Sequence, residues 1–193
     1  MHDFASLRRT LLDLSCSIAV RTHAAFHLRT LGSPEAVGAI SECVVLREDS
    51  VLMRHELAYI LGQIRNPAAC PVLAGLLEDT SDDVLVRHEA AEAIGAIGDT
   101  SYIPVLEKFC SDPAPEVSET CQLAVDLLSW RKKNGPENGT TGSQSIFNSI
   151  DPAPPSEGVS SVGELSDRFL DSSLSLFERY RAMFALRNLN TDS

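Results

Sequence analysis

The chain is 193 residues long, 44% of them hydrophobic, and it carries a formal net charge of −11 at pH 7. This length suits one domain with its own core, or one domain and the beginning of another. The most apolar N-terminal stretch, LLDLSCSIAV, is broken by Asp13 and followed by Arg21, so the sequence predicts neither a membrane span nor a signal peptide. The acidic charge without a basic stripe argues against nucleic acid as a partner and favours a cationic one.

The five cysteines are scattered along the chain, and no CxxC pair occurs among them. An odd number without regular spacing is not the pattern of a disulfide framework or of a structural zinc site. We therefore expect small buried thiols in a reducing compartment, which predicts a cytoplasmic protein.

From the N-terminus onward the sequence repeats itself. Three similar segments are RTHAAFHLRTLG, RHELAYILGQI and RHEAAEAIGAIG, and their first residues, Arg21, Arg54 and Arg87, are spaced by 33 residues. Each unit reads as a helix, a short acidic loop and a second helix that ends near glycine. Helix pairs of this period bury their apolar faces only by stacking, so we predict an all-α fold, an α-solenoid of the HEAT type.

The third unit gives the most detailed expectation. A first helix is predicted over PAACPVLAGLLE, beginning at Pro67, because proline suits the first turn of a helix. The loop DTSDD then supplies caps for the second helix, and Gly98 is placed to end it. A fainter fourth unit begins at Val117 with VSETCQLAVDLLSW.

The repeat pattern stops after Trp130 and resumes near the C-terminus. We predict a HEAT-repeat half over residues 1–133, a linker rich in Pro, Gly and Ser over 134–163, and the start of a second, incomplete half over 164–193. In this last part, aligning Phe184 with Phe26 also aligns Arg179 with Arg21.

The triplet Arg-His-Glu occurs at the same point of the two central repeats. For Arg54 and Arg87 we predict a scaffold role, in which each arginine pairs with an acidic residue of the loop before it, Asp49 or Asp82. The two arginines are then explained by the stacking of the repeats.

The residues that follow these arginines require another explanation, because the first repeat has Thr22 and His23 there and the fourth has Glu119 and Thr120. Equivalent positions on neighbouring helices lie roughly 8–10 Å apart and project from the same face, within reach of one ion. Imidazole and carboxylate together suit non-haem iron, manganese or zinc. We predict a metal site made of His55, Glu56, His88 and Glu89.

Other interpretations of this pattern stay open. A single His-Glu pair is most often a solvated surface, and two pairs in register could line a charged groove for a partner. Structural zinc sites are typically closed and rich in cysteine, unlike this pattern. The pairs continue with LAYI and AAEA, so the HExxH motif of zinc proteases is absent, as are GxSxG and P-loop motifs.

Four segments together closely resemble deoxyhypusine hydroxylase, a HEAT-repeat di-iron monooxygenase: RHELAYILGQ, VRHEAAEAIGAIG, SIDPAPP and LFERYRAMFALRNL. The resemblance implies a pair of Fe(II) ions that activates dioxygen and hydroxylates deoxyhypusine, a modified lysine of one eukaryotic translation factor, which completes hypusine biosynthesis. It implies metal ligation by the same four residues, His55, Glu56, His88 and Glu89.

The chain also departs from the pattern of this family. Family members resemble two similar halves, each with two His-Glu pairs, whereas no histidine follows His88 here. We therefore expect a truncated product with weak or no hydroxylase activity, unless two copies combine their halves. The alternative function is a non-catalytic HEAT-repeat scaffold that binds a cationic protein segment.

Overall fold

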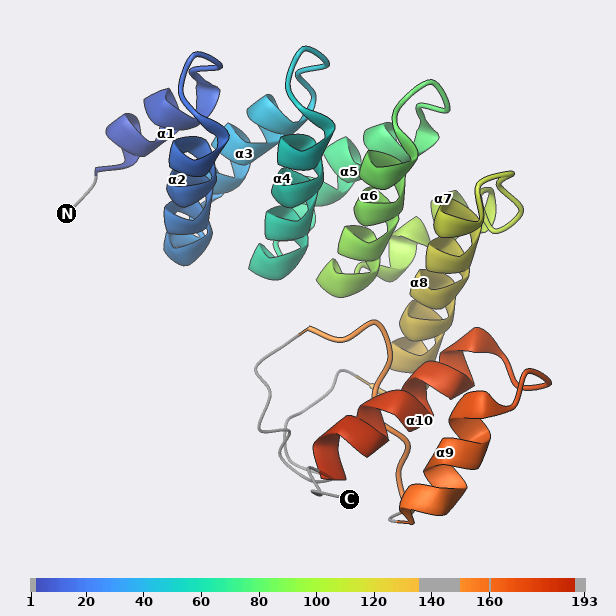
Figure 1. The fold of residues 1–193 in the computed structure, drawn as a ribbon. Helices are drawn as coiled ribbons and strands as arrows, with labels where there is room; N and C mark the ends of the chain where they lie inside the picture. Colours follow the sequence, from blue (N-terminus) through green and yellow to red (C-terminus); the bar gives the residue numbers. More distant parts are fainter. Residues whose placement is uncertain (1–2, 136–149, 160, 190–193) are drawn as a thin grey trace.

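The computed structural model describes residues 3–135, 150–159 and 161–189, and within these ranges it contains ten α-helices, two short 3-10 helices and no strand (Figure 1). This confirms the predicted all-α class. No helix in these ranges is both long and apolar enough to cross a membrane. The α-helices are α1 Phe4–Leu12, α2 Ile18–Leu31, α3 Pro34–Val44, α4 Val51–Ile64, α5 Cys70–Glu78, α6 Val84–Ile97, α7 Ile103–Glu107, α8 Pro115–Asn134, α9 Val162–Leu170 and α10 Leu176–Leu189, and the 3-10 helices are η1 Pro67–Ala69 and η2 Thr100–Tyr102.

The helices form consecutive hairpins that stack in chain order. The second helices, α2, α4, α6 and α8, stand side by side in one row, with the first helices of the hairpins behind them (Figure 1). One continuous hydrophobic core runs through this stack from α1 to α8. The predicted HEAT-type solenoid is therefore confirmed.

Caps define where the second helices begin and end. Ser17 and Ser50 accept hydrogen bonds from the backbone N–H groups of the first turns of α2 and α4, and Asp83 of the DTSDD loop caps α6 in the same way. Helices α2 and α6 end at Gly32 and Gly98, whose positive φ angles of 58° and 91° favour glycine. The predicted caps and the predicted stop at Gly98 are confirmed.

The predicted helix start at Pro67 is different in detail. Residues Pro67–Ala69 form a 3-10 turn, and the α-helix begins only at Cys70. Pro71 has no N–H group, so it cannot donate the α-helical hydrogen bond to the carbonyl oxygen of Pro67. That oxygen accepts instead from the N–H of Cys70, which tightens the first turn.

Glycines allow the central second helices to approach closely. A Cβ atom on Gly62 of α4 would lie 2.9 Å from the Cα atom of Ala93 on α6, and one on Gly95 of α6 would lie 3.0 Å from the Cβ atom of Ala124 on α8. Side chains at these two points would push the helices apart. The short spacing of α4, α6 and α8 therefore depends on Gly62 and Gly95.

Buried arginines link each repeat to the one that follows. Arg54 donates from Nε to the carbonyl oxygen of Val44 at 2.8 Å and from its two terminal nitrogens to Asp82 at 2.7 and 2.5 Å. Arg21 and Arg87 make the same pair of contacts, Arg21 with Leu11 and Asp49, and Arg87 with Leu77 and Asp112. The scaffold role predicted for these arginines is confirmed.

The predicted partners of the arginines are wrong. Arg54 binds Asp82 rather than Asp49, and Arg87 binds Asp112 rather than Asp82. Because the Nε atom of each arginine is held by a carbonyl oxygen at the end of the preceding helix, the terminal nitrogens face the loop of the next repeat. Each pair therefore joins two repeats instead of stabilising one hairpin.

Helix α10 packs across one end of α8 (Figure 1), where Phe177 and Phe184 share a hydrophobic cluster with Leu123 and Leu127. Arg179 donates from Nε to the carbonyl oxygen of Phe169 at 2.9 Å, ten residues upstream, as the three other arginines do. The alignment of Arg179 with Arg21 is thus confirmed.

Part of the predicted linker packs against α10. Ala153 is fully buried, Arg181 donates to the carbonyl oxygen of Pro154, and Arg187 pairs with Asp151 through both carboxylate oxygens. Residues 136–149 and 160 of this range lie outside the described residues. The predicted domain boundaries remain predictions.

Candidate metal centre

Two neighbouring helices place their histidines face to face. His55 on α4 and His88 on α6 occupy equivalent positions of consecutive repeats, and their ring centroids are 5.7 Å apart. Both side chains are partly exposed, at 26% and 23%. The spacing of the repeats therefore brings two imidazoles to the same side of the stack.

Glu89 lies between these two rings. Its Oε2 atom is 3.0 Å from Nε2 of His55 and 3.9 Å from Nε2 of His88, and its side chain is only 6% exposed. One ligand atom from each of the three residues lies within 4.8 Å of the others. Two imidazole nitrogens and one carboxylate oxygen therefore converge on a volume that suits a single metal ion.

Glu56, the fourth predicted ligand, stands apart from this group. Its Oε1 atom lies 3.8 Å from Nδ1 of its neighbour His55, on the opposite side of the ring from Glu89. Glu89 faces the histidine of the preceding helix, whereas the equivalent position on the helix before Glu56 is Thr22. The structure thus brings together three of the four predicted ligands.

Thr120 also lies at this site. In the sequence it is notable only as the residue of the fourth repeat that stands where the third repeat has Glu89. Its Oγ1 atom lies 3.3 Å from Nδ1 of His88. Thr120 occupies on α8 the position that Glu89 occupies on α6, so it faces His88 as Glu89 faces His55. The alignment of the fourth repeat contained this signal, because it matched Thr120 to Glu89.

Comparisons with known proteins agree with this architecture. The family described as HEAT repeats matches residues 6–85, and the family described as PBS lyase HEAT-like repeat matches residues 86–112. The chain is 46% identical to deoxyhypusine hydroxylase of Danio rerio over 98% of its own length, and 47% identical to that of Homo sapiens over 95%. A solved structure of human deoxyhypusine hydroxylase in complex with glycerol superposes on 97% of the chain with a TM-score of 0.89 at 46% identity.

The chain therefore resembles deoxyhypusine hydroxylases in both sequence and fold. It spans 61% of the Danio rerio relative, 58% of the human one, and 63% of the chain in the solved structure. The similarity to deoxyhypusine hydroxylases covers the helices that carry His55, His88 and Glu89, as well as the α9–α10 hairpin.

The two histidines have opposite electrostatic environments. The hydrogen bond to Glu89 raises the pKa of His55 above its ordinary value, although burial opposes this. Burial lowers the pKa of His88. The Nδ1 atom of His55 is buried and has no hydrogen-bond partner among the described residues.

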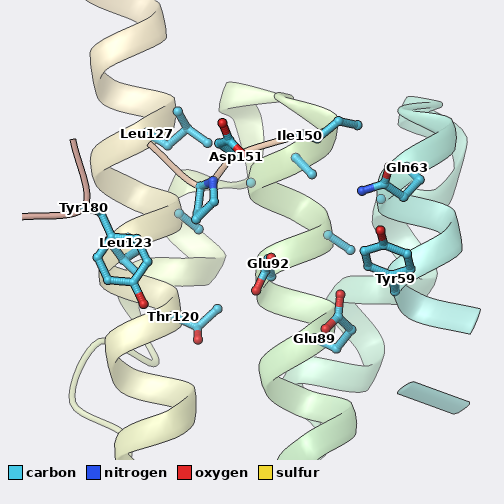
Figure 2. A pocket seen from close by; sticks show the side chains of 16 residues that line it. Tyr59, Gln63, Glu89, Glu92, Thr120, Leu123, Leu127, Ile150, Asp151 and Tyr180 are labelled. Carbon is cyan, nitrogen blue, oxygen red and sulfur yellow. The ribbon is translucent and has the colours of Figure 1, made fainter. Parts of the chain in front are cut away.

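A cavity of about 80 Å³ adjoins the three residues. Glu89 contributes to both, and the cavity extends from it between α4, α6 and α8 (Figure 2). Glu92 and Thr120 line its sides, Tyr180 enters from α10, and Asp151 comes from the segment that packs on α10. The candidate metal centre therefore opens into a cavity that the later part of the chain helps to close.

Proposed function

We propose that this chain contributes to an iron-dependent hydroxylase that uses dioxygen to hydroxylate the deoxyhypusine side chain of a eukaryotic translation factor. In this proposal His55, His88 and Glu89 hold Fe(II). Glu56 is not a ligand of this ion and lies beside Nδ1 of His55, on the side of the ring away from Glu89. The observation that carries it is the convergence of three ligand atoms within 4.8 Å, in a chain similar to deoxyhypusine hydroxylases over almost its whole length.

The residues present fit one iron ion. Two imidazole nitrogens and one carboxylate oxygen are the donor set of many non-haem Fe(II) oxygenases, and the positions left open are available to dioxygen and substrate. When bound, the iron supplies the electrons that activate dioxygen. The di-iron centre that the resemblance implies needs further ligands, because the described part of the chain contains one such group of three residues.

The residues around the site have separate roles in this proposal. Glu89 holds a proton on Nε2 of His55 in the metal-free protein, and this proton leaves when the nitrogen becomes a ligand. Thr120 fixes the ring orientation of His88 through Nδ1.

Cytoplasmic localisation is part of the same proposal, supported by five cysteines that are all free.

The test measures iron and activity separately. The chain is purified without chelator, its iron content is determined, and turnover is assayed on a deoxyhypusine-containing protein with Fe(II) and dioxygen. We expect His55→Ala, His88→Ala and Glu89→Ala to lose bound iron, and Glu56→Ala to lose less of it. His27→Ala, a change on α2, serves as the control.

A second candidate is a scaffold that binds a cationic protein segment without chemistry. The net charge of −11 and the acidic lining of the cavity favour it. The two candidates differ in metal content, since a scaffold needs none. A wild-type protein that binds no iron, even after incubation with Fe(II) under anaerobic conditions, would contradict the enzyme and leave the scaffold.

A further inference from the structure

Glu92 lies one helical turn after Glu89 on α6, and Figure 2 shows its carboxylate directed into the cavity. Within the described part of the chain, its carboxylate makes no hydrogen bond or ion pair. Its oxygens also lie outside the group of three metal-ligating residues. No contact within the described residues therefore explains why a carboxylate points into this cavity.

The charges around Glu92 are unbalanced. Among the described residues, the cavity is lined by three carboxylates, Glu89, Glu92 and Asp151, and by no lysine, arginine or histidine. Glu89 faces His55 and Asp151 pairs with Arg187, whereas Glu92 makes no ion pair among the described residues. Burial raises the pKa of Glu92 and the negative charge of Glu89 raises it further, while the charge of His55, which is already paired with Glu89, offsets this only in part. A bound cation would relieve both effects.

The rest of the lining indicates which kind of cation fits. Between the acidic residues the wall is formed mainly by aliphatic side chains and two tyrosines, among them Leu123, Leu127, Ile150, Tyr59 and Tyr180, with Gln63 and Thr120 as its uncharged polar side chains. A bare metal ion requires oxygen or nitrogen ligands on several sides, and among the described residues Glu92 is not part of the group whose ligand atoms converge in this way. The wall suits methylene groups that end in an ammonium group.

We propose that Glu92 binds the terminal ammonium of an aliphatic amine side chain and so determines which substrates reach the candidate metal centre. This deepens the proposed function and rests on it. Glu92 lies about 4.5 Å beyond Glu89 along the helix axis, a distance of a few carbon–carbon bonds. An ammonium held at Glu92 would therefore place the carbons of its stem, rather than the nitrogen, beside His55, His88 and Glu89.

The experiment titrates the folded, chelator-treated chain with 1,4-diaminobutane and n-butylamine, and follows backbone amide shifts by NMR. n-Butanol serves as the uncharged probe. We expect both amines to shift amides of α6 near Glu92, with n-butanol much weaker, and Glu92→Gln to weaken amine binding about tenfold or more. The matched control is Asp126→Asn, which alters a partly buried carboxylate of α8 that is bonded to Gln122 and does not line the cavity.

Iron content, measured on the same variants, separates this inference from the proposed function. Glu92→Gln should retain wild-type iron while losing amine affinity. The inference is overturned if wild type binds no amine, if Glu92→Gln binds amines as well as wild type does, or if Glu92→Gln loses its iron. A wild type without iron that still binds amines through Glu92 would instead overturn the proposed hydroxylase.

Discussion

Two sets of residues share helices α4 and α6 but follow different rules. Arg54 and Arg87 are buried and bind aspartates of the next repeat, with 3% exposure for the Arg54 side chain and 2% for Asp82. The residues next in sequence, His55 and His88, are partly exposed and face one another and Glu89. Successive residues of a helix point about 100° apart, so neighbours in sequence reach opposite environments.

The difference shows how to separate scaffold from site in a repeat protein. The arginine contact recurs in three stacked repeats, and Arg179 repeats its carbonyl half. Such recurrence is what stacking requires. Within the described residues, the contact of a histidine with a glutamate of the next repeat occurs once, between α4 and α6, and Nδ1 of His55 makes no hydrogen bond there. A feature confined to two repeats contributes little to stacking, which supports a functional role.

The largest expected effect is on the arginine side of this comparison. Arg54→Ala leaves Asp82 buried without its bidentate partner, and we expect a loss of about 3–5 kcal/mol in the free energy of unfolding. Urea unfolding followed by circular dichroism measures this. The control is Arg8→Ala, because Arg8 pairs with Glu42 on the surface and should contribute less than about 1 kcal/mol. Equal losses in the two variants would refute the scaffold role.

The second-largest effect concerns the spacing of α4 and α6, on which both the packing of the repeats and the candidate metal centre depend. Gly62→Ala places a methyl group 2.9 Å from the Cα atom of Ala93, so we expect roughly 1–3 kcal/mol of destabilisation and weaker iron binding as α4 moves from α6. Gly75→Ala is the matched control, because its Cβ atom would meet nothing within 4 Å. This exposed helical position should gain about 0.5–1 kcal/mol. If Gly62→Ala binds iron normally, helix spacing does not determine the site.

Much of the fold could be predicted because it depends on local chemistry. The 33-residue spacing, the caps at Asp83 and Gly98 and the alignment of Arg179 all follow from residues within one repeat. The 3-10 turn at Pro67 also has a local cause, because Pro71 has no N–H group to donate to the carbonyl oxygen of Pro67. The expectation of an α-helix from Pro67 took only the first proline into account.

What could not be predicted depends on how one repeat sits on the next. The choice of Asp82 over Asp49 as the partner of Arg54 depends on which way the guanidinium group faces in the stack. The separate position of Glu56 has the same cause, since Glu89 faces His55 of the preceding repeat, whereas the repeat before Glu56 has Thr22 in place of that histidine. Glu92 lies one turn from Glu89, but only the cavity shows that the two face the same space.

The third effect tests whether Thr120 belongs to the site or only to helix packing. Thr120→Val removes the oxygen that lies 3.3 Å from Nδ1 of His88 and keeps the side-chain volume. We expect iron affinity to fall about tenfold with little change in stability. Competition with a chelator of known iron affinity measures this. Ser118→Ala, which removes a hydroxyl on the same helix that is bonded, among the described residues, only to the carbonyl oxygen of Pro115, should leave iron affinity at the wild-type value, and an equal loss in both variants would contradict the role of Thr120.

The smallest expected effect distinguishes the two sets of residues by the pH at which they act. The hydrogen bond to Glu89 raises the pKa of His55 in the folded chain above 6.5. Its contribution to stability is therefore fully present below pH 6.5 and is lost as the pH rises through the folded value. In the metal-free protein, Glu89→Gln should lower the pKa of His55, read from its ring C–H resonance by NMR titration, and should reduce the stability that wild type loses as the pH rises through the folded pKa of this residue. The arginine-bound aspartates cannot produce this signal. Burial raises the pKa of Asp82, but the hydrogen bonds from Arg54 and from the Asp83 N–H lower it by more, so its pKa lies below the ordinary value. Asp82 therefore titrates only in acid. An unchanged pKa of His55 in Glu89→Gln would mean that Glu89 does not hold the proton of this ring, and that the pair is packed together without being electrostatically coupled.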